Sequence, residues 1–81
     1  MRTWDDVIES LRIRPGGGYA RLAKRLQMDR SRLSAILRGR AMPAFTTRTM
    51  KPPELDRLAR VLRLSKSDVE RIAKNTMEAR R

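Results

Sequence analysis

The sequence predicts a single all-helical domain, on three observations. Five stretches of the chain place apolar residues at the i, i+3, i+4 spacing of a helix face. No stretch shows a convincing alternation of apolar and polar residues, the pattern of a half-buried strand. The chain has 81 residues, enough for one hydrophobic core and too few for a separate catalytic or effector domain. We therefore expect residues 1–75 to form one domain and residues 76–81 a short basic tail.

The first predicted helix spans Trp4 to Ile13. Its apolar face consists of Trp4, Val7, Ile8 and Leu11. Thr3 stands where a side chain caps the start of a helix, and Trp4 is expected to anchor the core. Pro15 and the three glycines at residues 16–18 then interrupt any helical pattern, because proline lacks a backbone donor and glycine loses much entropy on ordering. We expect a flexible connector there.

Two short helices joined by a tight turn are predicted between residues 19 and 39. Their apolar positions are Tyr19, Leu22, Ala23 and Leu26 in the first, and Leu33, Ile36 and Leu37 in the second. Small Ala23 allows the two helices to cross closely. Asp29 is a good N-cap for the second helix, which is expected to run from Arg30 to Arg38 and to end at Gly39.

The last two predicted helices follow Pro53 and Ser65. Proline suits the first turn of a helix, and Ser65 with Asp68 has the spacing of a capping box. The predicted core positions are Leu55, Leu58, Ala59 and Leu62, then Val69, Ile72 and Ala73. The basic residues of these helices are Arg57, Arg60, Lys66, Arg71 and Lys74, and they are interleaved with acidic residues. That pattern is typical of a solvated face with i,i+3 and i,i+4 ion pairs.

The charge of the chain indicates a polyanionic partner. Lysine and arginine number 20 against 9 acidic residues, for a formal net charge of +11. Residues 14–51 carry ten of the basic residues and a single acidic one, Asp29. Most of the basic residues are arginine, which suits phosphate oxygens and the edge of guanine, although a GC-rich genome would produce the same bias.

The composition also argues against several classes of protein. There is no cysteine and no histidine, which excludes disulfides, thiolate or imidazole metal sites and the Cys-His and Ser-His types of catalysis. We expect no enzyme, no cofactor, no metal and no small-molecule ligand. No apolar run approaches the length of about 18 to 20 residues that spans a membrane. Asp5, Asp6 and Glu9 stand where a signal peptide carries positive charge, so a cytoplasmic, nucleoid-associated protein is expected.

The segment YARLAKRLQMDRSRLSAILRG, residues 19–39, resembles the helix-turn-helix of the phage-repressor and Cro-like (XRE) family. The resemblance rests on Leu22-Ala23, Leu26, Met28, Leu33, Ile36 and Arg38-Gly39-Arg40. Residues 58–72, LARVLRLSKSDVERI, look like the fourth helix of that family and the capped start of its fifth. The resemblance covers most of the chain. It implies a five-helix bundle of the phage-repressor type, in which helices 2 and 3 form the helix-turn-helix.

In such a motif the second helix enters the major groove of double-stranded DNA and the first crosses the phosphate backbone. The residues expected to face the bases are Arg30, Ser31, Ser34 and Ala35, with Arg32 at the edge of that face. The residues expected at phosphates are Tyr19, Arg21, Lys24, Arg25, Arg38, Arg40, Arg48 and Lys51. Arg30 is the first choice for a bidentate contact with guanine, and Ala35 for a thymine methyl group.

The chain departs from the family pattern at three places. Gln27 and Arg63 stand where relatives often carry glycine, and a non-glycine residue with positive φ costs on the order of 1 kcal/mol. The link from Ala41 to Pro52 is also several residues longer than usual. With Thr46, Thr47, Arg48, Thr49 and Lys51 it could follow phosphates or reach a neighbouring groove. Alternatively, it is a solvated loop with Phe45 and Met50 tucked against the core.

The resemblance favours a sequence-specific transcriptional regulator, most simply a repressor that occupies an operator. A non-regulatory DNA binder, such as a plasmid partition, excision or nucleoid protein, would share the fold. An antitoxin ranks lower, because the segment after Asn75 is short for a toxin-binding tail. RNA or single strands are disfavoured by the presence of only one Trp, one Tyr and one Phe. We expect a homodimer on a palindromic site, held through the fifth helix, residues 76–81 or the long link.

Overall fold

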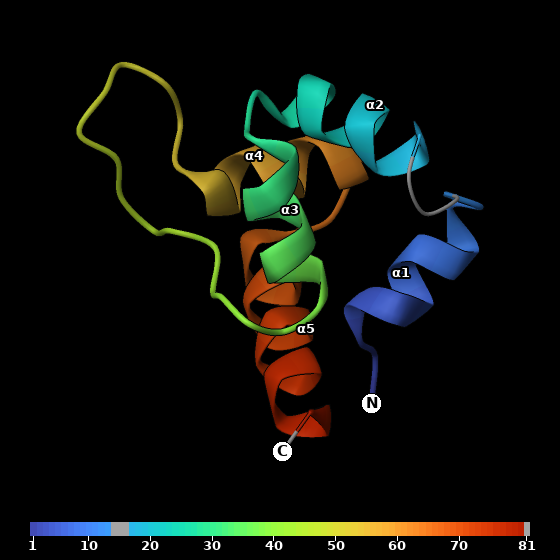
Figure 1. The fold of residues 1–81 in the computed structure, drawn as a ribbon. Coiled ribbons are helices and arrows are strands. Elements are labelled where there is room, and N and C mark those ends of the chain that lie inside the picture. The colour runs from blue at the N-terminus through green and yellow to red at the C-terminus, as the bar shows by residue number, and fades with distance from the viewer. Residues whose placement is uncertain (14–16, 81) are drawn as a thin grey trace.

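The computed structural model describes residues 1–13 and 17–80, and this part of the chain is all-helical (Figure 1). Its helices are α1 (Trp4–Ser10), α2 (Gly17–Leu26), α3 (Arg30–Leu37), α4 (Glu54–Leu62) and α5 (Lys66–Ala79). The expected order of five helices is confirmed. None of these helices combines the length and the apolar character needed to cross a membrane.

The starts of the helices follow from local capping. The backbone N–H of Thr3 donates to the carboxylate of Asp6 over 2.9 Å at the start of α1. The hydroxyl of Ser65 accepts from the N–H of Asp68 over 3.0 Å at the start of α5. Pro53 and Asp29 take the N-cap positions of α4 and α3, although the Asp29 side chain makes no capping hydrogen bond. The predicted starts of α1, α3 and α5 are confirmed, whereas Pro53 directly precedes α4 instead of standing in its first turn.

The first four helices end in the same backbone conformation. A residue with positive φ follows the last turn: Arg12, Gln27, Gly39 and Arg63, with φ of 55°, 55°, 75° and 56°. That residue and the next donate their N–H groups to carbonyls of the last turn, as Ile13 does to Ile8 over 3.2 Å. The helix predicted to reach Ile13 therefore ends at Ser10. The prediction was wrong because no glycine marks this left-handed end.

The start of α2 also differs from the prediction. Gly17 and Gly18, which we assigned to a flexible connector, form the first turn of α2. The N–H groups of a first turn have no intrahelical partner in any case, so this is where a helix best tolerates poor formers. Pro15 and Gly16, the rest of the predicted connector, lie outside the described residues.

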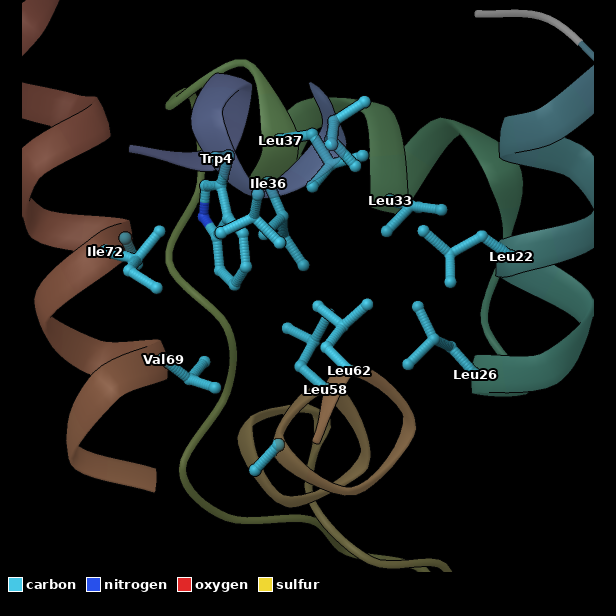
Figure 2. Packing of buried hydrophobic residues seen from close by; sticks show 14 of the residues in the cluster. Trp4, Leu22, Leu26, Leu33, Ile36, Leu37, Leu58, Leu62, Val69 and Ile72 are labelled. Carbon is cyan, nitrogen blue, oxygen red and sulfur yellow. The ribbon is translucent and has the colours of Figure 1, made fainter. Parts of the chain in front are cut away.

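The core lies where the helices converge (Figure 2). Its buried members on α2 and α3 are Leu22, Ala23, Leu26, Leu33, Ile36 and Leu37; those on α4 and α5 are Leu55, Leu58, Ala59, Leu62, Val69, Ile72 and Ala73. These positions were predicted. Trp4 is fully buried and anchors α1, as expected, whereas Leu11 is 45% exposed because α1 ends before it.

The two end segments of the described chain are joined. The N–H of Trp4 donates to the hydroxyl of Thr76 over 2.8 Å, and the Asn75 amide donates to the carbonyl of Arg2 over 2.8 Å. Thr76 is buried and α5 continues to Ala79, so the domain boundary predicted after residue 75 falls inside a helix. Residues 76–79 are part of the folded body instead of a separate tail.

Candidate nucleic-acid interface

The outer face of α3 forms a shallow groove at the surface. Its lining residues are Arg30, Ser31, Ser34, Ala35, Arg38 and Arg40. Arg30 and Ser31 are exposed, and Ser34 and Ala35 are half-buried. The structure therefore brings together four of the predicted base-reading residues and two of the predicted phosphate-binding residues. The groove contains no acidic side chain.

The packing of the opposite side of α3 explains why this face is outward. Leu33 and Ile36 are fully buried and Leu37 nearly so, so one side of the short helix is committed to the core. α2 packs against α3, and buried Ala23 provides the small residue expected at their crossing. The turn between the helices passes through Gln27 at a φ of 55°, the left-handed conformation anticipated for this position.

A side chain from α4 holds this turn. The guanidinium of Arg57 donates to the carbonyls of Leu26 and Gln27 over 3.0 and 2.8 Å. These carbonyls lie at the C-terminus of α2, where a cation also offsets the negative end of the helix dipole. The charge pattern of the sequence predicts a solvated face for Arg57, and that prediction is wrong. Arg57 instead links α4 to the turn that sets the angle of α3.

The C-terminal end of α3 is held by α5. The guanidinium of Arg80 donates to the carbonyl of Arg38. A Cβ atom added to Gly39 would lie 2.9 Å from the carbonyl oxygen of Thr76, and Gly39 has a φ of 75°. Glycine is thus required here both for the backbone conformation and for the close approach of α5. Both ends of α3 are therefore positioned by contacts from later helices.

Arg32 differs from the other predicted base-reading residues. Its guanidinium binds the Glu54 carboxylate at the start of α4, with a 2.9 Å contact, and donates to the carbonyl of Met42 over 3.1 Å. It does not line the α3 groove. The hydrogen bond to Glu54 raises the pKa of Arg32 from its ordinary value. In this structure Arg32 connects α3 to the long link and to α4.

Glu54 also fixes the base of that link. One of its carboxylate oxygens accepts from the N–H of Ala44 over 3.0 Å, and the N–H of Leu55 donates to the Ala44 carbonyl over 3.0 Å. The hydrogen bonds from Arg32 lower the pKa of Glu54; the Ala44 N–H and the charges of Arg32 and Arg57 act the same way, and burial opposes them. The carboxylate is therefore held ionised.

The link beyond Ala44 stands away from the helices (Figure 1). Phe45 is 52% exposed and Met50 is fully exposed, so the expectation that both tuck against the core is wrong. The segment is held at its base, and its internal hydrogen bonds join Thr47, Thr49 and the N–H of Lys51. Neither side chain belongs to the hydrophobic cluster of the described residues.

The remaining predicted phosphate-binding residues are spread over two elements. Arg21, Lys24 and Arg25 are exposed on α2, and Tyr19 is half-buried against the core. Arg48 and Lys51 are exposed on the link. Arg12, which the sequence did not single out, lines a hollow between α1 and α2 together with Arg21 and Arg25.

The geometry agrees with the comparison of the chain with protein families. The family model described as "Helix-turn-helix domain" matches residues 6–72. The chain belongs to the helix-turn-helix domain family. The match agrees with the resemblance to phage-repressor and Cro-like (XRE) proteins, and the partner of the helix-turn-helix domain is DNA. No curated protein and no solved structure gives a significant match.

Sequence reasoning missed the residues that position the helix-turn-helix, chiefly Glu54 and Arg57. Both lie on α4, and their partners are 10 to 31 residues away in the chain. The local pattern gave only a charged helix face, which most often is solvated. Of these two residues, only Glu54 could have been singled out from the sequence. It is an acidic residue in the first turn of a helix that follows the long link.

Proposed function

We propose that this helix-turn-helix protein is a sequence-specific transcriptional regulator that acts as a repressor by occupying an operator. In this proposal α3 enters the major groove, where Arg30, Ser31, Ser34 and Ala35 meet base edges. Arg38 and Arg40, at the end of the same groove, meet phosphates. The protein binds DNA without catalysing a reaction and works in the cytoplasm, at the nucleoid.

One observation carries this proposal: the outer face of α3 offers donors that the fold itself does not use. Among the described residues, no hydrogen bond or ion pair engages the side chain of Arg30, whereas Arg32 and Arg57 are both bound within the fold. A free guanidinium in the first turn of such a helix can make two parallel hydrogen bonds to guanine O6 and N7. We assign Arg30 to base reading and Arg32 to positioning.

We further propose that two copies bind a palindromic site. A single α3 covers few base pairs, and pairs of half-sites about one helical turn apart provide the selectivity that one cannot. Within residues 1–13 and 17–80, the large exposed apolar side chains are Met1, Leu11, Phe45 and Met50, and none lies on α5. These described residues therefore offer no extensive apolar surface for a dimer interface. The proposal is therefore that DNA itself brings the two copies together.

The test is selection of preferred duplexes from a random pool, followed by affinity measurements for the selected duplex and a scrambled one. We expect a specificity ratio of about a thousand or more for the wild type. Arg30→Ala should cost about 1 to 3 kcal/mol on the selected duplex and little on the scrambled one. Arg71→Ala, an exposed arginine on α5, is the matched control and should weaken both duplexes slightly and equally.

Two results would contradict the proposal. A wild-type ratio near one with a steep dependence on salt would indicate an architectural binder that responds only to phosphates. The second result is that Arg30→Ala loses no more affinity for the selected duplex than Arg71→Ala does. That result would overturn the role of Arg30 in base reading without contradicting regulation.

A further inference from the structure

The segment between Ala44 and Glu54, which we call the 45–53 loop, combines exposed apolar and basic side chains. Phe45 is 52% exposed and Met50 fully exposed. Arg48 and Lys51 are exposed beside them, and the chain has no acidic residue from Arg30 to Pro53. Phe45 directly follows Ala44 at the base of the loop, and Met50 lies within the loop; exposed apolar side chains on one projecting segment are a feature of binding surfaces.

The base of the 45–53 loop is fixed relative to α3. The Glu54 carboxylate holds the N–H of Ala44 and the guanidinium of Arg32, which belongs to α3. Pro43, just before the loop, is almost fully buried. Arg38 and Arg40, which line the α3 groove, precede this segment in the chain. The loop is therefore carried beside the recognition surface on a rigid base, with a free tip.

The charge of the loop determines which kind of partner its tip can contact. A second copy of the chain would bring another +11 charge toward Arg48 and Lys51, and charge repulsion opposes that contact. A duplex presents phosphates to these two side chains. Proteins that bind the minor groove use cationic side chains there and frequently insert apolar ones as wedges between base steps.

The length of the loop limits how far its tip can reach from the base. Residues 45–53 leave and return to one base, so the tip extends at most about 15 Å from it, at roughly 3.3 Å per residue. The minor groove is about 6 Å wide and lies on the far side of the phosphate strand that borders the major groove. With α3 in the major groove, the tip can cross one phosphate strand.

From these features we infer that the 45–53 loop is a second DNA-binding element that enters the minor groove flanking the segment read by α3. Met50 contacts base edges there, Phe45, nearer the base of the loop, contacts the sugars that border the groove, and Arg48 and Lys51 neutralise the phosphates on either side. This inference rests on the proposed function, because it takes α3 to be in the adjacent major groove. It adds a source of affinity and of preference for the flanking sequence.

The test uses the selected duplex with a G·C flank and the same duplex with an I·C flank. Inosine keeps the major-groove edge of guanine and lacks its minor-groove amino group. The wild type should bind the I·C flank at least about threefold more tightly, because a wedge in the minor groove meets that amino group. Phe45→Ala/Met50→Ala should lose about tenfold in affinity and should no longer distinguish the flanks.

The basic pair is tested through the salt dependence of binding. Arg48→Ala/Lys51→Ala should lower the slope of log affinity against log salt by about 2, one for each lost phosphate contact. The controls are Leu11→Ala, an exposed apolar residue beyond the end of α1, and Arg71→Ala/Lys74→Ala on α5. α1 lies on the opposite side of the molecule from the loop (Figure 1). Both controls should retain the flank preference, and the α5 pair should leave the slope nearly unchanged.

The outcomes separate this inference from the proposed function. If the wild type prefers its selected duplex, yet the loop variants match their controls in affinity, slope and flank preference, the loop inference is overturned and the regulator remains. If the loop variants instead abolish pairing of two copies on a palindrome while binding to a half-site is unchanged, the loop contacts a second copy and the inference is again overturned. If the wild type shows no preferred duplex, the proposed function and the loop inference are both overturned.

Discussion

Glu54 shows how much one side chain decides in a small domain. Its carboxylate accepts from Arg32 on α3 and from the N–H of Ala44, and its side chain is 13% exposed. Exposed ion pairs contribute little to stability, but a mostly buried acceptor whose loss leaves donors unpaired is costly. The sequence places Glu54 correctly at a helix start. It could not identify Arg32 as its partner, because contacts between distant residues follow from packing.

We expect Glu54 to make the stability of the protein depend on acid. Its pKa is lowered in the folded state, so its contribution is present above the pKa of the unfolded chain and is lost as the pH falls through the folded pKa. Near pH 7, Glu54→Gln should reduce the free energy of unfolding by about 1 to 2 kcal/mol. Denaturant titrations from pH 7 to pH 3 should show this difference shrinking in acid. A difference that stays constant would show that ionisation of Glu54 is irrelevant.

At the scale of the helices, starts were easier to predict than ends. Thr3, Pro53 and Ser65 act within one turn of their own positions, so a local pattern reveals them. Helix ends depend on a left-handed residue, which the sequence marks clearly only where glycine occupies it, as at Gly39. At Arg12 an arginine adopts that conformation, so the end of α1 was misplaced. The resemblance to a family, rather than any local signal, anticipated the strain at Gln27 and Arg63.

Relieving one of these left-handed ends should stabilise the protein. Arg63 has a φ of 56° and an exposed side chain that makes no ion pair among the described residues. Arg63→Gly should raise the free energy of unfolding by about 1 kcal/mol, because glycine adopts this conformation without a Cβ clash. Arg63→Ala, which removes the side chain and retains the Cβ, is the control and should give no gain. Equal stability of the two variants would refute the explanation by backbone strain.

At the scale of the whole molecule, the sequence predicted the all-helical fold and most of its core. It also grouped the groove residues Arg30, Ser31, Ser34 and Ala35 correctly, because helical periodicity alone places them on one face. It failed where distant parts of the chain meet: the hold of Arg57 on the turn, the base of the 45–53 loop, and the packing of Thr76 against Trp4. Each of these contacts joins segments separated by more than one helix or by a long link.

The net charge of +11 should control the assembly of the protein. Like charges oppose self-association, and phosphates remove that opposition. We therefore expect the free chain to sediment as a monomer at physiological salt. On a palindromic duplex the complex should contain two chains, whereas a single half-site should bind one. A stable dimer of the free chain would require an interface that overcomes this repulsion, and it would contradict assembly on DNA.

The link between Trp4 and Thr76 also has a mechanical consequence. Tension applied at the two ends of the chain would act first on the contacts of residues 2–4 with Asn75 and Thr76. While those contacts hold, a pull at the N-terminal end is transmitted to α5 without passing through the helix-turn-helix. A pull at the C-terminal end differs, because it acts on Arg80, which donates to the carbonyl of Arg38 at the end of α3. A tether at the N-terminal end should therefore leave the DNA-reading groove mechanically shielded, whereas one at the C-terminal end should not.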